Sequence, residues 1–409
     1  MVMNIKDLTL NNVGPFKDIH LGFPCTPNAS GMLPVTLITG ENGTGKSIII
    51  DSLRMLFKGV WGIDRNIIAD QHNFKMSMTL SVDGKDKTIE SSSFKDKNGR
   101  FELDTNDFEY SKSFSNIDDQ PIKNYVLDYW SPDLATDKFD IKSLNIIKAD
   151  KPLQTSFEKV FNNNDVNQFI CWADYLRGSQ NPTESNIGEV LYSTMSRMIT
   201  DCLAVGKFKY VSRTNLKPIV EVRGRELSIE KLSMGNLLIL THLVRTLYRV
   251  FGICSLNNRP IDQIGDVDGV LLIDEIENHL HPKWQKKVIG LIQKYFPKLQ
   301  LIITTHSPFV ISSVDNPKIF VCESMDDYSQ VRDISDNYSN MPVDEVLKSQ
   351  VFGVGPFGDK ITKLMADREK AMQDGNDGLK MKIENELLKF NQAYFSFYQL
   401  GEQLGLNES

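Results

Sequence analysis

The sequence predicts an α/β fold with a central sheet, an antiparallel β subdomain, a helical lobe and a C-terminal helical region. A glycine-rich segment at residues 40–47 lies between an apolar run and a helical pattern, which is the strand–loop–helix order of a phosphate-binding loop. Two short apolar runs, Val270–Ile273 and Leu299–Ile303, suit parallel strands that are covered on both faces. The dipeptide Asp83-Gly84 separates two runs of alternating polarity and predicts an antiparallel hairpin.

Composition and charge bound the class of protein. The chain has 409 residues, of which 41% are hydrophobic and 24% charged, as in soluble globular proteins. A net charge of −7 excludes a uniformly basic, DNA-coating surface but allows a local basic patch. The five cysteines are scattered without a C-x-x-C pair, which indicates reduced thiols. Because no stretch approaches the roughly 20 apolar residues of a membrane span and no signal peptide is recognisable, we expect a soluble, cytoplasmic protein without a membrane partner.

In the first part of the chain, strands are expected to flank one helix. Residues 47–59 carry apolar side chains at helical spacing, directly after the glycine-rich segment. A turn is expected at residues 12–16, whereas residues 92–120 are polar and show no clear pattern. Five segments are expected to be strands because of their alternating or apolar pattern: residues 4–10, 19–23, 74–82, 87–91 and 124–129.

The rest of the chain is expected to be mainly helical. Residues 206–229 return to strand-like alternation, with a turn at residues 222–225. Helical spacing is found in four segments: residues 150–205 with a loop at 162–165, residues 235–250, residues 284–295, and the last 70 residues with a break at 375–378. We therefore expect a head at residues 1–340, with the helical lobe inserted at about 140–255, and a C-terminal helical region at 341–409 that docks a partner or a second copy, or folds back on itself.

The glycine-rich segment matches the pattern G-x-x-x-x-G-K-[ST] in full. Its glycines let backbone N–H groups point inward, and the helix that follows presents its positive dipole end to an anion. Lys46 is expected to reach the β- and γ-phosphates of a nucleotide, and the Ser47 hydroxyl to bind Mg²⁺. The simpler alternative is a glycine-rich turn with a stray lysine. The expected nucleotide-binding residues are Gly40, Glu41, Asn42, Gly43, Thr44, Gly45, Lys46 and Ser47.

Acidic residues follow the first of the two apolar runs, and a histidine follows the second. Asp274 is placed to hold Mg²⁺, and Glu275 to orient the attacking water, which is the division that phosphoryl transfer requires. His306 ends the second strand and is placed to contact the γ-phosphate. The predicted catalytic residues are therefore Glu275, Lys46 and His306. The alternatives are an acidic turn and an ordinary polar cap.

A second anion site is expected at the start of the long helix near residue 235. Ser233 and Gly235 lie at its N-terminus, where backbone N–H groups and the helix dipole attract phosphate. A serine N-cap followed by glycine would explain the same residues without a ligand. The order of this segment relative to the other motifs favours the anion site.

Together these motifs resemble the soluble ABC-type ATPases of the AAA family, particularly the SMC/RecF-like branch, over about residues 1–325. Residues 277–282 are similar to the D-loop of that branch, and residues 11–16 to its first strand and turn. The chain departs from the family in having Met234-Gly235-Asn236 where Gly-Gly-Gln is usual. The glutamine loop that adds a metal ligand is also unassigned, with Gln71 and Gln120 as its two candidates.

The resemblance implies a homodimer, or a higher even oligomer, in which ATP and Mg²⁺ lie between the phosphate loop of one subunit and Ser233 of the other. No long heptad run lies between Ser47 and Leu232, so a chromosome-type SMC arm is excluded. The order of elements resembles the ATPases of Septu-type (PtuA-like) and retron-associated anti-phage systems. Those proteins work with a separately encoded nuclease, often of HNH type. Residues 323–327 lack the pattern of a TOPRIM nuclease, so we expect no nuclease site in this chain.

Three functional hypotheses follow. The first is a dimeric ATPase switch that senses a trigger and controls a partner effector in anti-phage defence. The second is a stand-alone RecF/SMC-like DNA-repair ATPase, and the third is an ATP-bound scaffold with low turnover. Six basic residues within residues 207–225 could bind the backbone of DNA or of retron RNA/DNA, although a solvated hairpin explains them too.

Overall fold

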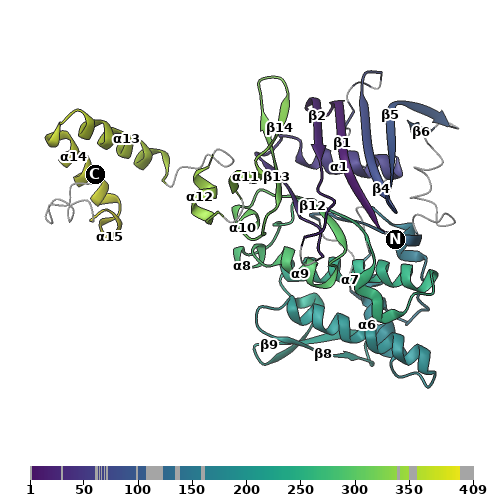
Figure 1. Cartoon of the computed structure of the whole chain (residues 1–409). Coiled ribbons are helices and arrows are strands. Elements are labelled where there is room, and N and C mark those ends of the chain that lie inside the picture. Colours follow the sequence, from purple (N-terminus) through teal and green to yellow (C-terminus); the bar gives the residue numbers. More distant parts are fainter. Residues whose placement is uncertain are drawn as a thin grey trace. The chain divides into compact units, whose positions relative to one another are not determined.

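The computed structural model describes most of the chain: residues 2–28, 31–59, 63, 65, 67–68, 70, 72–97, 100–106, 123–133, 139–157, 162–338, 341–349 and 357–396. The chain divides into two compact units, Met1–Val343 and Asp344–Ser409 (Figure 1). The first unit contains the large sheet and every residue expected in the nucleotide site that the structure describes.

Eleven strands form the large sheet, in the order β6-β5-β4-β1-β2-β14-β13-β3-β12-β11-β7. Neighbours among β13, β3, β12, β11 and β7 are parallel, and β6 to β2 pair antiparallel. This mixed sheet confirms the predicted α/β fold with an antiparallel β subdomain. Its strands are β1 Met3–Val13, β2 Phe16–Gly22, β3 Thr36–Gly40, β4 Lys75–Val82, β5 Lys85–Lys97, β6 Arg100–Thr105, β7 Val126–Trp130, β11 Gly269–Ile273, β12 Leu299–Thr304, β13 Lys318–Ser324 and β14 Ser329–Asp333.

The helices of the described chain surround this sheet or form the lobe and the C-terminal unit. They are α1 Lys46–Lys58, α4 Lys151–Gln154, α5 Asn163–Leu176, α6 Pro182–Asp201, α7 Met234–Leu256, α8 Pro282–Gln285, α9 Val288–Tyr295, α10 Pro308–Ile311, α11 Ser335–Tyr338, α12 Val343–Lys348, α13 Asp359–Gln373, α14 Asp377–Phe390 and α15 Gln392–Phe395.

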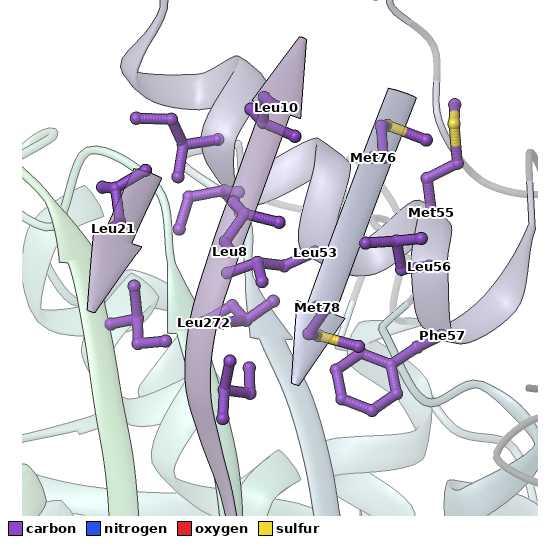
Figure 2. Packing of buried hydrophobic residues seen from close by; sticks show 14 of the residues in the cluster. Leu8, Leu10, Leu21, Leu53, Met55, Leu56, Phe57, Met76, Met78 and Leu272 are labelled. Atoms are coloured by element: carbon purple, nitrogen blue, oxygen red, sulfur yellow. The ribbon is translucent and has the colours of Figure 1, made fainter. Parts of the chain in front are cut away.

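The helix α1 is held by the largest apolar cluster of the head. Figure 2 shows Leu53 and Leu56 of α1 packed against Leu8 of β1 and Met76 of β4. All four side chains are fully buried. Because α1 begins directly after the phosphate loop, this packing fixes the loop relative to the sheet. Burial of aliphatic side chains of this size contributes on the order of 1.5–3 kcal/mol each.

The first hairpin forms as predicted, but the sheet extends further than expected. Asp83 and Gly84 both have positive φ angles, 50° and 78°, as a tight two-residue hairpin turn requires. The expectation of no pattern at residues 92–120 was wrong for its first part, because β5 continues to Lys97 and β6 pairs with it. The strand β5 is rich in charged and hydroxyl residues and lacks the apolar alternation that marks a strand, whereas β6 alternates but has only two apolar residues, Phe101 and Leu103.

The helical lobe contains α4 to α7 and a three-stranded antiparallel sheet of β8 Lys207–Ser212, β9 Lys217–Val222 and β10 Arg225–Ser228. Two expected boundaries were wrong. The segment at residues 162–165 begins α5, and the Asn162 side chain accepts a hydrogen bond from the backbone N–H of Asn164 as its cap. The helix expected at residues 284–295 is split into α8 and α9.

The helix α7 is the core of the lobe. It is long and apolar enough to cross a membrane by length and composition, but 94% of its most apolar window is buried within the protein. A charged cluster joins it to the sheet. Arg245 and Arg249 of α7 lie 2.7 and 3.0 Å from Asp128 of β7. Burial alone would raise the pKa of Asp128, but the two guanidinium groups lower it to about 2.

The C-terminal unit has a small core of its own, in which Ile383 and Leu387 of α14 pack with Phe395 of α15. The side chain of Asn376 caps α14, at the break predicted for residues 375–378. Several large apolar side chains remain exposed, including Met381 at 57% and Tyr394 at 53%.

Candidate nucleotide-binding site

The phosphate loop follows β3 and leads into α1. Its glycines Gly40, Gly43 and Gly45 have φ angles of 137°, 82° and 100°, a region that disfavours residues with a Cβ atom. A Cβ atom on Gly45 would lie 2.6 Å from the ring of Phe16, and one on Gly40 would lie 2.1 Å from the carbonyl oxygen of Cys322. The loop is therefore closely packed from behind, with the N-terminus of α1 at its end.

Lys46 is buried in this loop, with 5% of its surface exposed. Its Nζ donates hydrogen bonds to the carbonyl oxygens of Gly40 and Glu41, at 3.1 and 2.7 Å. Burial lowers the pKa of Lys46. Among the described residues no carboxylate lies within ion-pair distance of this ammonium group, so its positive charge is available to an anionic ligand.

Ser47 and Asp274 come together although 226 residues of sequence lie between them. The Ser47 hydroxyl donates to Oδ1 of Asp274 at 2.8 Å. The same carboxylate oxygen accepts from the Thr304 hydroxyl at 2.6 Å. The sheet order β3-β12-β11 places the carboxyl ends of these three parallel strands next to one another, so the loop, Thr304 and Asp274 meet at one edge. Ligand sites of open α/β sheets lie at this edge.

Glu275 follows Asp274 in a constrained backbone conformation, with φ of 51°. Its backbone N–H donates to the Thr304 hydroxyl at 2.8 Å, which fixes the turn at the end of β11. Burial, and next the adjacent charge of Asp274, raise the pKa of the half-buried Glu275 carboxyl. A raised pKa makes this carboxylate a stronger proton acceptor than a solvated one.

His306 lies at the end of β12, beside the phosphate loop. Its imidazole lies near the backbone of Gly40, which acts to raise the His306 pKa. Burial, and next the charge of Lys46, lower its pKa, so the imidazole is neutral at pH 7. The structure therefore brings together all the predicted catalytic residues: Lys46, Glu275 and His306.

Sequence reasoning missed a basic group at this site. The guanidinium of Arg65 lies 3.0 Å from Asp51 Oδ2 and 3.4 Å from Asp274 Oδ2, and its side chain is 47% exposed. Asp51 is also paired with Arg54 at 2.7 Å. A signal was present in the sequence, because an acid within the apolar stripe of α1 needs a cation. The sequence did not indicate which arginine would supply it.

The expected second anion site lies at the start of α7. Ser233 is the N-cap residue, is exposed, and makes no hydrogen bond from its side chain to the helix. Gly235 is buried against the D-loop segment, where a Cβ atom would lie 2.4 Å from the carbonyl oxygen of His279. In the described protomer neither residue is hydrogen-bonded to the phosphate loop, and their role toward a second subunit stays a prediction.

The two candidates for the glutamine loop, Gln71 and Gln120, lie outside the described residues. The basic segment of the small sheet is described, and half of its charges are paired. Its three paired side chains are Lys209 with Glu221, Arg213 with Asp174, and Lys217 with Glu230. In the described chain only Lys207, Arg223 and Arg225 lack a carboxylate partner. The case for a continuous basic surface that binds a nucleic-acid backbone is therefore weaker.

The residues present fit a magnesium–nucleotide complex. The glycines of the loop have left-handed φ angles, and Cβ atoms on Gly40 and Gly45 would clash with neighbouring atoms. The Lys46 ammonium group lies in this loop and forms no ion pair with a described carboxylate. Among the described residues no three His, Cys, Asp or Glu side chains form a complete metal site. Ser47 and Asp274 could therefore hold Mg²⁺ only together with ligand oxygens and water, which is how proteins usually bind it.

Comparison with known families places the chain. The model described as "AAA domain, putative AbiEii toxin, Type IV TA system" matches residues 35–312. The chain belongs to this family. The match extends from β3 and the phosphate loop to α10, and so includes each of the site residues described above except Phe16 and Cys322, which only pack behind the loop.

The curated relatives confirm the predicted resemblance. The chain is 24% identical to a Septu protein PtuA of Bacillus thuringiensis, over 91% of this chain and 90% of the relative. It is 30% identical to the Retron Ec83 probable ATPase of Escherichia coli, over 38% of this chain and 28% of that protein. The chain thus spans less than a third of this retron relative, but most of the Septu protein.

Solved structures with a similar fold include the SMC head domain from Thermotoga maritima, at a TM-score of 0.45 and 14% identity, covering 81% of this chain and 98% of that one. The recombination mediator protein RecF is another, at a TM-score of 0.43 and 16% identity, with the same coverages. Likeness at this level supports no functional conclusion.

Proposed function

We propose that this chain is an ATPase that closes as a dimer on ATP and Mg²⁺ and controls a separately encoded effector, an HNH-type nuclease, in bacterial anti-phage defence. One observation carries the ATPase part of the proposal. Lys46, the Ser47–Asp274 pair and Glu275 converge on a single phosphate loop, with 2.8 Å between the Ser47 hydroxyl and Asp274. Such a constellation supplies both the grip and the charge stabilisation that phosphoryl transfer needs.

The residues of the chain divide the work of hydrolysing ATP to ADP and phosphate. Backbone N–H groups of the loop and the Lys46 ammonium would hold the phosphates. Ser47 and Asp274 would hold Mg²⁺, which neutralises phosphate charge when bound. Glu275 would accept a hydrogen bond from the attacking water and orient it. His306, kept neutral by burial and by the neighbouring Lys46 charge, would donate a hydrogen bond toward the outermost phosphate.

The dimer is proposed because each chain has a hydrogen-bond donor, the Ser233 hydroxyl, that its own helix does not use. Ser233 is exposed at the N-terminus of a 23-residue helix, with its hydroxyl unused in capping. A helix N-terminus of this kind favours an anion. In the proposed dimer, Ser233 of each subunit would contact the nucleotide held by Lys46 of the other. The buried contact of Gly235 with the D-loop carbonyl keeps this helix end in a fixed place.

We infer the effector and the trigger from the relatives, which are named Septu protein PtuA and retron probable ATPase. The exposed apolar side chains of α14 and α15 are proposed to dock the effector or a second copy. Nucleic acid, either DNA or retron RNA/DNA, is proposed as the trigger. We place the ATPase in the cytoplasm, where phage nucleic acid enters.

The proposal is tested by trapping the closed state. Glu275→Gln keeps the shape of the side chain but removes its proton-accepting charge, so ATP should bind and hydrolysis should fall by about 100-fold or more. Light scattering after gel filtration should then find a dimer with ATP and Mg²⁺, but a smaller species with ADP. Lys46→Ala should bind no nucleotide, and Glu189→Gln on the exposed face of α6 should behave as wild type.

Two results would overturn the proposal. One is a Glu275→Gln protein that stays monomeric with ATP and releases phosphate at the wild-type rate. The other is a dimer that traps ATP while the proteins encoded beside it neither copurify nor change activity. The second result, together with ATP-dependent DNA binding by the purified chain alone, would point to a stand-alone repair ATPase.

A further inference from the structure

The half-buried carboxylate of Glu277 contacts the loop that carries His306. One of its oxygens, Oε2, accepts a hydrogen bond from the Thr305 hydroxyl at 2.7 Å. The other, Oε1, accepts one from the backbone N–H of His306. Burial raises the pKa of Glu277, and the same two hydrogen bonds oppose that shift. Both oxygens are thus used by consecutive residues of one loop.

This loop is held from several sides. The backbone N–H of Thr305 donates to the carbonyl of Ile38 at 3.0 Å, which ties the loop to β3. The Thr305 hydroxyl accepts from the backbone N–H of Ser307 at 3.0 Å, and the Ser307 hydroxyl donates to Gln285 at 2.7 Å. Only Glu277 holds the His306 backbone itself with a side chain among the described residues. The imidazole of His306 is then directed to the backbone of Gly40 in the phosphate loop.

We propose that Glu277 is a positioning residue for ATP hydrolysis: its two carboxylate oxygens hold Thr305 and the His306 backbone, and so aim the His306 imidazole at the phosphate loop. This inference rests on the proposed function. Glu277 touches no phosphate-loop residue by hydrogen bond in the described chain, so it acts through His306. Hydrogen-bond partners that orient metal-ligating side chains change affinity or activity about 10- to 100-fold when mutated, and we expect a loss of this size for Glu277.

The contact requires hydrogen-bond acceptors and shape, but not charge. In Glu277→Gln the amide oxygen can accept from the His306 N–H, while the amide NH₂ donates to the Thr305 hydroxyl, which rotates to receive it. In Glu277→Ala the His306 N–H loses its partner. If Glu277 is a positioning residue, Glu277→Gln should therefore keep activity that Glu277→Ala loses. If Glu277 were a general base, both variants should lose activity equally, since neither glutamine nor alanine can take up the proton.

The kinetic experiment uses the full chain with saturating Mg²⁺. Glu277→Ala is expected to lower kcat about 10- to 100-fold with KM for ATP changed less than about twofold, whereas Glu277→Gln keeps kcat within about threefold. Glu275→Gln is the matched control, because the same exchange two residues away should lower turnover by about 100-fold or more. Combining Glu277→Ala with His306→Ala should cost no more than His306→Ala alone. Equal losses for Glu277→Gln and Glu277→Ala, or additive losses in the double variant, would overturn the inference.

Hydrogen exchange decides the inference independently of turnover. The peptide spanning residues 301–309 should lose protection in Glu277→Ala and keep it in Glu277→Gln. Unchanged protection in Glu277→Ala would reject the contact between Glu277 and the His306 loop. This outcome does not depend on turnover, because a wild-type protein that hydrolyses no ATP would by itself reject only the proposed function. If Glu277→Ala does not fold, Thr305→Val removes one of the two donors instead. It should also expose this peptide, and full protection in that variant would count against the inference.

Discussion

The buried histidine of α7 should make the protein sensitive to mild acid. His242 stacks on the Trp130 ring, with centroids 4.9 Å apart, and its Nε2 lies 3.1 Å from the Ser131 carbonyl. That contact fixes the proton on Nε2, and Nδ1 has no partner among the described residues. Burial, and next the charge of Arg245, lower the pKa of His242 from 6.5 to about 3, although Asp128 acts against the shift. The cation is therefore excluded from this place in the fold.

The size of the effect follows from the two pKa values. Below pH 6.5 the unfolded chain binds a proton at His242 that the folded chain does not, so stability falls as pH falls, until about pH 3. Each pH unit in this window costs about 1.4 kcal/mol, and the loss between pH 7 and pH 5 is about 2 kcal/mol. Asp274 and Glu275 line the same small cavity as His242.

The assay compares urea unfolding of the wild type and of His242→Gln at pH 7 and pH 5. Glutamine keeps a donor near the Ser131 carbonyl but does not titrate. Other groups titrate equally in both proteins, so the difference between their pH dependences isolates His242. We expect the wild type to lose about 2 kcal/mol more than the variant over this range. Equal losses in the two proteins would refute the assignment of a buried, neutral imidazole.

Two further predictions concern the loop and the buried charge cluster. Gly45→Ala should weaken ATP binding in a nucleotide titration, because a left-handed alanine costs about 1–2 kcal/mol and its Cβ would lie 2.6 Å from an aromatic ring. Gly84→Ala is the control, since Gly84 is also left-handed but has open space around it. Asp128→Ala should lower the unfolding free energy by about 3–5 kcal/mol, because it leaves Arg245 and Arg249 buried without their carboxylate; urea unfolding at pH 7 measures it, and a loss below about 1 kcal/mol would contradict it.

Local sequence identified those parts of the site that are contiguous in the chain. The loop ending in Lys46, the acid pair Asp274 and Glu275, and His306 each stand next to an apolar strand, so pattern and position agree. The partners that reach the site from elsewhere could not be found in this way. The sequence pattern places Thr304 at the end of a strand and gives it no other role, but its hydroxyl joins Asp274 to the backbone of Glu275. Which groups share a hydrogen bond depends on strand order, and the sequence does not state that order.

The same reasoning explains the errors in the fold. The Asn-rich run at residues 162–165 has the composition of a loop, but asparagine is also a preferred helix cap, and here it begins α5. The strand β6 lies at the edge of the large sheet and has only six residues, of which Phe101 and Leu103 are apolar, so its alternation is too short to stand out. Edge strands with charged side chains resist pairing with other chains. Their sequences consequently resemble those of loops.

Arg65 leads to a prediction about metal affinity that does not depend on turnover. Its guanidinium lies 3.4 Å from Oδ2 of Asp274, while Ser47 and Thr304 occupy Oδ1. A second cation near this carboxylate reduces the attraction that it exerts on Mg²⁺. Because the Arg65 side chain is 47% exposed, the interaction is screened and is worth about 0.5–1 kcal/mol. Arg65→Gln should therefore bind Mn²⁺, a spectroscopic substitute for Mg²⁺, about two- to fivefold more tightly in the absence of nucleotide. Arg177→Gln in the helical lobe serves as the control, and unchanged or weaker Mn²⁺ binding by Arg65→Gln would show that Asp274 does not carry the metal.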